Sequence, residues 1–190
     1  MILCVEALGR LVIHIRYGVP GKSYGLWKYD SELGATYRPN SYNTLTSLNN
    51  DAFRNKEDVF DPNPAGSLRI MVFGGSTTFG YNLADGDTFT EKLEQKLRKI
   101  QGLERTQVLN AGEICYSSGH SLIRIKRLVP KLKPDYVILD EGLNDILNAW
   151  VLNSDGVSLN ALYETKTYGV LGKGYGQNRW LEWNSVILEF

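Results

Sequence analysis

Ser76 directly follows an apolar run that ends in two glycines, Gly74 and Gly75. In open α/β sheets, ligands bind beyond the carboxyl ends of the strands, and a tight turn there can present a nucleophile. A helix that starts at the same turn would aim backbone N–H groups at a developing negative charge. The pattern therefore indicates acyl transfer, in which the Ser76 hydroxyl attacks a carbonyl carbon.

Two further positions offer hydrogen-bond donors for the same reaction. Gly112 and Asn144 each follow another apolar run of the chain. A glycine has no Cβ, so its backbone can come close to a substrate, and an asparagine amide donates while it stays neutral. Together with N–H groups near Ser76 they would form an oxyanion hole, in which each donor lowers the barrier by about 3 kcal/mol.

Alternating strands and helices over residues 67–153 are expected to position these three residues. The expected strands cover 69–73, 107–109 and 135–139, and the expected helices cover 87–100, 118–132 and a stretch that begins near 141–145. This alternation predicts a parallel sheet with right-handed crossovers. Because parallel strands end at the same edge of a sheet, the three strand ends should converge on one rim.

Helical spacing predicts which side chains of the first two helices face the sheet. These are Phe89, Leu93, Leu97 and Ile100 in the first helix and Leu122, Ile125, Leu128 and Val129 in the second. The third strand is expected to bury the run Tyr136 to Leu139. A basic cluster on the second helix is expected to be its solvated face: Arg124, Lys126, Arg127, Lys131 and Lys133.

Three blocks of the sequence resemble those of the SGNH (GDSL-type) hydrolase family. They are Val-Phe-Gly-Gly-Ser-Thr-Thr-Phe-Gly at 72–80, Asn-Ala-Gly at 110–112 and Gly-Leu-Asn-Asp at 142–145. The resemblance covers about residues 35–150, because the stretch 50–54 is similar to a segment that precedes the first block in envelope-associated members. The order and spacing of the blocks also match the family.

The resemblance implies a fold, an activity and a set of site residues. The fold would be a three-layer α/β/α arrangement with a parallel, flavodoxin-like sheet. Ser76 would be the nucleophile of an ester hydrolase that works through an acyl-serine intermediate, and Gly112 and Asn144 would be the oxyanion donors. The substrate would be a small-molecule, lipid or carbohydrate ester, and the location would be the cell envelope or its periplasmic face.

The fourth block of the family, Asp-x-x-His, occurs nowhere in the chain. Of the two histidines, His120 is expected at the surface or the rim, and His14 is expected to be structural or exposed. A serine hydroxyl is a poor nucleophile without a base, so activity of this chain stays an open question. The fold is expected to be incomplete at its carboxyl end.

Two alternatives to a serine hydrolase follow from these residues. The first is a non-catalytic SGNH-like subunit or interaction protein, since a sheet of three strands leaves an open edge that invites a second chain to complete it. The second is a phosphate cradle at the glycine turn. The Walker pattern requires a lysine that is absent here, which disfavours the phosphate cradle.

Other polar residues near the strand ends receive structural interpretations. Ser117 and Ser118 are expected to be turn or N-cap residues of the second helix. Cys115 is expected to be a loop or packing thiol, and Asp145 a helix cap or hydrogen-bond partner. Asp140 and Glu141 are adjacent, so they should face opposite sides of the sheet rather than form a carboxylate pair.

The composition excludes several other classes of function. The 190 residues carry 21 basic and 21 acidic side chains, so no basic field favours nucleic acid. Two cysteines and two separated histidines favour neither a disulfide framework nor a metal site, and no motif indicates a cofactor.

The chain divides into three parts by its patterning. Residues 1–66 form an amino-terminal segment and a loop-rich preamble with one or two expected short strands, residues 67–153 form the SGNH-like core, and residues 154–190 form a carboxyl-terminal extension. The apolar stretch 1–16 is too short to span a bilayer and lacks the basic start of a signal peptide. We expect this stretch to be an amphipathic helix or strand packed on the domain. The alternative is an interfacial segment that associates with a membrane surface, or the end of a lost membrane anchor.

Overall fold

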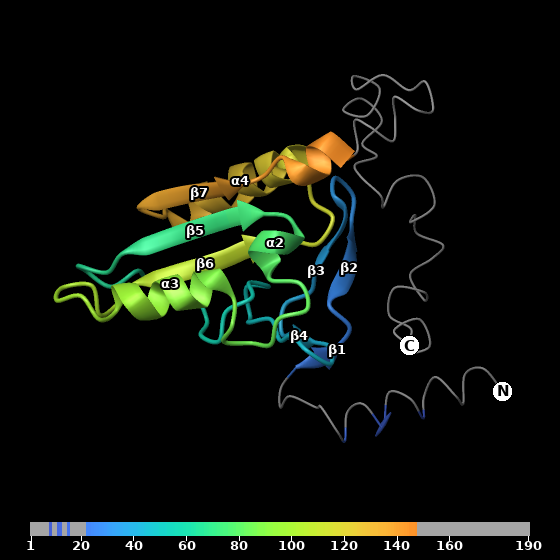
Figure 1. Ribbon diagram of the computed structural model, residues 1–190, viewed down its shortest axis with the longest axis horizontal. Coiled ribbons are helices and arrows are strands. Elements are labelled where there is room, and N and C mark those ends of the chain that lie inside the picture. Colours follow the sequence, from blue (N-terminus) through green and yellow to red (C-terminus); the bar gives the residue numbers. More distant parts are fainter. Residues whose placement is uncertain (1–7, 9–10, 13–14, 16–21, 148–190) are drawn as a thin grey trace.

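The computed structural model describes residues 8, 11–12, 15 and 22–147 (Figure 1). The predicted carboxyl-terminal extension 154–190 lies outside these residues. No helix in the described part of the chain has the length and apolar character needed to cross a membrane.

A parallel sheet of three strands forms the centre of the described structure (Figure 1). Its strands are β5 (Arg69–Gly74), β6 (Gln107–Gly112) and β7 (Tyr136–Asp140), in the order β6-β5-β7. In the register of the sheet, Gly74 pairs with Gly112 on one side and with Asp140 on the other. The three carboxyl ends therefore lie side by side, which confirms the predicted α/β class and the predicted common rim.

Helices cover both faces of this sheet. The helices after β5 and β6 are α2 (Ser76–Phe79), α3 (Phe89–Leu97) and α4 (Ser118–Leu132), and residues 143–147 are helical after β7. Leu93 and Leu97 of α3 pack on the face that carries Ile70 and Val72. On the opposite face, α4 packs on Met71 and its neighbours. Alternate residues of β5 thus contact helices on opposite sides, as the period of two in a strand requires.

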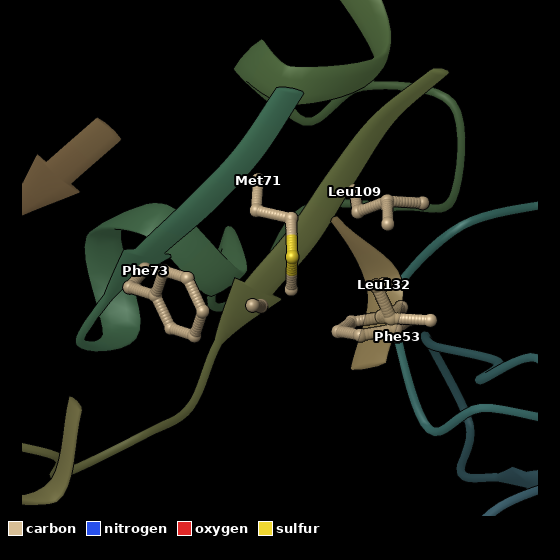
Figure 2. Packing of buried hydrophobic residues seen from close by; sticks show 6 residues of the cluster. Phe53, Met71, Phe73, Leu109 and Leu132 are labelled. Carbon is tan, nitrogen blue, oxygen red and sulfur yellow. The ribbon is translucent and has the colours of Figure 1, made fainter. Parts of the chain in front are cut away.

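The larger apolar cluster lies between α4 and the sheet (Figure 2). Its buried members are Phe53, Met71, Phe73, Leu109, Ala111 and Leu132. Ile125, Leu128 and Val129 of α4 pack against it, as the helical spacing predicts. Phe53 comes from the amino-terminal segment, so this segment contributes to the core and is not only a surface layer.

Three predictions of buried side chains are wrong. Phe89, Ile100 and Leu122 are exposed. Phe89 is the first residue of α3 and Ile100 lies beyond its end, because the helix is shorter at both ends than predicted. Leu122 lies beside the stripe of α4 that contacts the sheet, a stripe that begins with the buried Ser121.

The prediction of a buried third strand is also wrong. Tyr136, Val137, Ile138 and Leu139 of β7 are 39–63% exposed. Within the described part of the chain, β7 pairs with β5 on one side only. It is therefore an edge strand of this part of the sheet, and its apolar side chains lie largely uncovered there.

The preamble contains more regular structure than predicted. It holds four short strands: β1 (Ser23–Tyr24), β2 (Trp27–Asp30), β3 (Gly34–Tyr37) and β4 (Ser41–Tyr42). β1 and β4 pair in parallel, whereas β2 and β3 form an antiparallel hairpin near the carboxyl end of the central sheet (Figure 1). Leu26, Tyr37 and Leu48 of the preamble cluster with Phe79 of α2.

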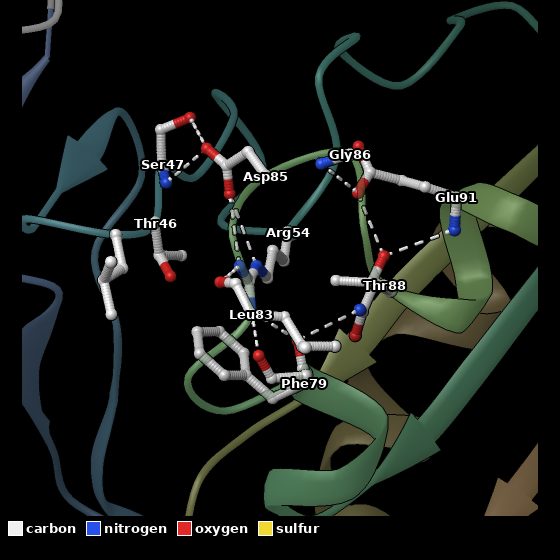
Figure 3. A network of polar contacts seen from close by, with 12 residues as sticks. Thr46, Ser47, Arg54, Phe79, Leu83, Asp85, Gly86, Thr88 and Glu91 are labelled. Atoms are coloured by element: carbon white, nitrogen blue, oxygen red, sulfur yellow. Dashed lines mark hydrogen bonds and ion pairs between the residues drawn. The ribbon is translucent and has the colours of Figure 1, made fainter.

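Arg54 joins the preamble to the segment that follows α2 (Figure 3). Its guanidinium is buried and donates to the carbonyl oxygens of Phe79, Gly80 and Leu83. It also lies 3.4 Å from the Asp85 carboxylate, which accepts hydrogen bonds from Ser47. Because a buried charge must be paired and hydrogen-bonded, this network fixes the end of α2 against the preamble.

Candidate active site

A small hollow opens at the common rim of the sheet. It has a volume of about 50 Å³ and is lined by residues 75–77 and 140–144. Ser76 and Asn144, which come from the first and third sequence blocks, both line it. The structure therefore brings together two of the three predicted site residues.

Ser76 lies at the point where β5 turns into α2. It is the first residue of α2 and is partly exposed, and its carbonyl accepts from the N–H groups of Gly80 and Tyr81. The turn requires glycine at Gly74, because a Cβ there would lie 2.1 Å from the Thr78 hydroxyl oxygen and 2.6 Å from the backbone oxygen of Asp140. The close approach of α2 to β7 thus explains the first glycine of the block.

Asn144 reaches over the turn that precedes Ser76. Its amide nitrogen Nδ2 donates to the carbonyl oxygen of Tyr116 over 2.6 Å. The same nitrogen lies 2.7 Å from the position that a Cβ on Gly75 would occupy. The absence of a side chain at Gly75 therefore makes room for the Asn144 amide next to Ser76.

Gly112 occupies a different environment from the other two predicted residues. Its N–H donates to the side-chain oxygen of Asn110 over 3.1 Å. A Cβ on Gly112 would lie 2.4 Å from the backbone nitrogen of Phe79, so the glycine allows β6 to pack directly under α2. The structure does not place Gly112 at the hollow, and its role as an oxyanion donor stays a prediction that this geometry does not favour.

Comparison with solved structures matched esterases. AlinE4, an SGNH-hydrolase family esterase, is 30% identical over 53% of this chain and 49% of that chain, with a TM-score of 0.40. The psychrotrophic esterase EstA from Pseudoalteromonas sp., in a structure inhibited by monoethylphosphonate, is 21% identical over 52% of this chain and 48% of that chain, with a TM-score of 0.38. The chain is similar to SGNH-hydrolase family esterases. It spans about half the length of the structures it matches. No protein-family model matched the chain, and neither did any curated protein.

Two neighbouring carboxylates at the end of β7 bind the flanking helices at the rim. Asp140 accepts from the Thr78 hydroxyl over 2.8 Å, and Glu141 accepts from the hydroxyl of Ser121. Asp140 therefore contacts α2 and Glu141 contacts α4, so the two do not form a carboxylate pair, as predicted. Burial raises the pKa of Glu141, and the nearby Asp145 and Asp140 charges add to this rise.

Asp145 is a hydrogen-bond partner of the start of α4. It accepts from the backbone N–H of Ser118 at 3.1 Å and from the Ser118 hydroxyl at 2.5 Å. Ser117, the residue before Ser118, is the N-cap of α4. The predictions for Ser117 and Asp145 are confirmed, whereas Ser118 is the first residue of α4 rather than a turn or N-cap residue. No cluster of three or more metal-ligating side chains occurs among the described residues.

His120 is buried beneath the rim, so its expected exposure at the surface or the rim is wrong. Its exposed fraction is 1%, and its ring stacks on the Tyr116 ring with centroids 4.5 Å apart. Its Nδ1 accepts from the backbone N–H of Ser117 over 3.2 Å and lies 3.0 Å from the hydroxyl oxygen of that serine. Burial lowers its pKa to about 4, against a weaker opposing effect of Asp145. His120 is therefore neutral at neutral pH.

Arg124 does not belong to the solvated face of α4 that the sequence predicts. It is buried, donates to the carbonyl oxygen of Ala111, and lies 3.2 Å from the Glu113 carboxylate. Burial raises the pKa of Glu113, and the Arg124 charge opposes this effect. Lys126, Arg127, Lys131 and Lys133 are exposed as predicted.

Cys115 and Tyr116 lie in the loop between β6 and α4, next to the site. Cys115 is a partly buried loop residue with a φ of 65°, which is the left-handed region that favours glycine. Burial raises the pKa of its thiol, as expected for a packing thiol rather than a nucleophile. Tyr116 contacts the site through its backbone carbonyl, which no side-chain pattern in the sequence could indicate.

Proposed function

We propose that this chain carries the acyl-transfer site of an SGNH-type ester hydrolase, with Ser76 as the nucleophile. The observation that carries the proposal is the shared hollow of Ser76 and Asn144, with the Asn144 amide nitrogen held over Gly75. The volume of the hollow is comparable to that of one or two water molecules. It suits the reacting carbonyl group of an ester rather than a long acyl chain.

The reaction would begin with attack of the Ser76 oxygen on the ester carbonyl carbon. The carbonyl oxygen becomes an oxyanion, and an N–H of Asn144 donates to it. The alcohol then leaves with a proton, and water later releases the acid from the acyl-serine. Since no histidine lines the hollow within the described residues, acylation should be slow with ordinary esters and detectable with strongly activated reagents.

A fluorophosphonate probe tests this assignment, because it reacts with an activated serine and forms a stable adduct. Intact-mass spectrometry should show one adduct, and peptide mapping should place it on Ser76. A Ser76→Ala variant should not react. A Ser67→Ala variant, which changes a serine just before β5 that does not line the hollow, should react like the parent protein. Equal labelling of the parent and the Ser76→Ala variant would contradict the proposal.

Within the described residues β7 is an exposed edge strand, which favours a second candidate, a non-catalytic SGNH-like subunit whose sheet is completed by another chain. Tyr136 and Leu139 of β7 are exposed, and so are Leu143 and Ile146 just after it. An apolar edge of this kind is a template for strand pairing. Light scattering after size-exclusion chromatography tests this idea, which requires an assembly larger than one chain and no labelling of Ser76.

We also propose that the stretch 1–16 contacts a membrane surface. Leu8, Leu11, Val12 and Ile15 are helical and exposed, and their spacing places them on one side of a helix. Such an apolar stripe can enter the interface of a bilayer. Flotation with anionic vesicles should be lost in a Leu11→Ser, Ile15→Ser double variant, and equal flotation of this variant and the parent would contradict the proposal.

A further inference from the structure

The loop between β6 and α4, residues 113–117, is held by three consecutive residues of the β2–β3 hairpin. The Tyr116 hydroxyl donates to the Ala35 carbonyl over 2.6 Å, the Thr36 hydroxyl donates to Glu113 over 2.9 Å, and the Ile114 N–H donates to the Tyr37 hydroxyl oxygen over 3.2 Å. The hairpin and the loop are far apart in sequence, so these bonds belong to the tertiary structure. They fix the loop at three points.

Tyr116 is bonded at both ends. Its hydroxyl binds the hairpin, and its carbonyl oxygen accepts from Asn144 Nδ2 over 2.6 Å. Its ring is almost completely buried, stacks on His120 and lies 5.9 Å from the Arg124 guanidinium carbon. A side chain bound in this way has little freedom to move its own backbone carbonyl.

This carbonyl decides which end of the Asn144 amide faces the turn at Gly75. A carbonyl oxygen only accepts, so it attracts the amide nitrogen and repels the amide oxygen. The nitrogen carries two N–H groups, of which Tyr116 engages one. The second N–H is left as the donor for a ligand at the hollow, since the nitrogen itself lies over Gly75.

We infer that Tyr116 is a positioning residue for the acyl transfer at Ser76, and that the β2–β3 hairpin is part of the support of the site. The hydroxyl of Tyr116 anchors the loop to the hairpin, and its carbonyl then holds the Asn144 amide in the donating orientation. This inference rests on the proposed function. The inference goes beyond the proposed function because it makes the preamble a determinant of the rate of acylation.

The test compares Tyr116→Phe with Tyr42→Phe, which also removes a hydroxyl from a buried tyrosine of the protein, in β4. The rate of fluorophosphonate labelling is measured against probe concentration. Tyr116→Phe should lower the maximal rate about tenfold, because a displaced donor weakens charge stabilisation, and should leave the half-saturating concentration unchanged. Tyr42→Phe should label within about twofold of the parent rate. Equal maximal rates in both variants would overturn the inference.

A second pair of variants tests the inference if Tyr116→Phe folds poorly. Thr36→Val removes the hydroxyl that binds Glu113, whereas Thr36→Ser retains one. The inference expects slower labelling in Thr36→Val and recovery to the parent rate in Thr36→Ser. A merely structural effect would lower stability in Thr36→Val without a change in the maximal rate of the folded fraction, and this outcome would overturn the inference.

A readout independent of reactivity separates this inference from the proposed function. The side-chain amide signals of Asn144 can be assigned in ¹H–¹⁵N spectra by their loss in Asn144→Asp. They should shift in Tyr116→Phe and stay in place in Tyr42→Phe. If the parent protein does not react with the probe, the proposed function fails, and unmoved amide signals would then overturn the positioning role as well.

Discussion

Replacing Gly75 with alanine tests the geometry of the site most directly. Gly75 has a φ of −82°, outside the left-handed region, so the effect of alanine comes from its Cβ. That atom would lie 2.7 Å from the Asn144 amide nitrogen, while an ordinary contact begins at 3.4 Å. The nitrogen must therefore move by about 0.7 Å, the difference between these distances. Because it ends a flexible side chain, it can yield.

The expected result is a large loss of reactivity with a small loss of stability. The movement breaks the hydrogen bond from Asn144 to Tyr116, which costs about 1 kcal/mol of the free energy of unfolding. A displacement of this size at a reacting centre slows acylation about 10- to 100-fold. Urea unfolding followed by circular dichroism gives the first quantity, and the rate of fluorophosphonate labelling gives the second.

Gly74→Ala is the matched control, because the two glycines are neighbours in the same turn. Its Cβ would lie 2.6 Å from the backbone oxygen of Asp140, an atom of β7 that cannot move without separating β7 from β5. This variant should lose about 3 kcal/mol or more of the free energy of unfolding. The reasoning is refuted if Gly75→Ala reacts at the parent rate, or if the two variants lose equal stability.

Three further predictions concern groups around the site. The pKa of His120 falls from 6.5 to about 4 on folding. As the pH drops from 6.5 to 4, the imidazole therefore takes up a proton in the unfolded chain but not in the folded chain, and the free energy of unfolding should fall by about 3 kcal/mol. Urea unfolding at pH 4 to 8 should show this loss in the parent but not in His120→Gln. The same dependence of the free energy of unfolding on pH in both proteins would contradict the prediction. Arg124→Met should cost about 3–5 kcal/mol by leaving the Glu113 charge buried alone, and adding Glu113→Gln should recover part of this in a double-mutant cycle; full additivity would contradict the pairing. Cys115→Gly should raise the free energy of unfolding by about 0.5 kcal/mol, since relief of the left-handed conformation exceeds the entropic cost of glycine, and a lower melting temperature would disprove it.

The parts of the fold that local patterns determine could be predicted from the sequence. The three parallel strands follow from apolar runs between helices, and the common rim follows from the parallel topology. The stripe Ile125, Leu128 and Val129 follows from the helical period. Ser76 and Asn144 could be placed at the site because each is the polar residue that directly follows a strand or its turn.

Residues whose environment depends on distant partners could not be predicted. Arg124 has charged neighbours on its helix, so its pattern indicates a solvated position. It is buried because Glu113, at the end of β6, supplies the opposite charge. His120 is buried for a similar reason, since Tyr116 and Ser117 surround its ring. Neither pairing leaves a periodic signal in the sequence.

The three sequence blocks indicate candidate donors, and the tertiary structure determines which of them lie at the hollow with Ser76. Gly112 uses its missing side chain to let β6 pack under α2, and its N–H is engaged by Asn110. The Asn144 amide is oriented by the Tyr116 carbonyl, which accepts from its nitrogen. The loop that carries Tyr116 is bound in turn to Ala35 of β3. A preamble without periodicity thus supports this loop through the backbone oxygen of Ala35 and the hydroxyls of Thr36 and Tyr37. The acyl transfer proposed at Ser76 would therefore depend on residues that belong to none of the three sequence blocks.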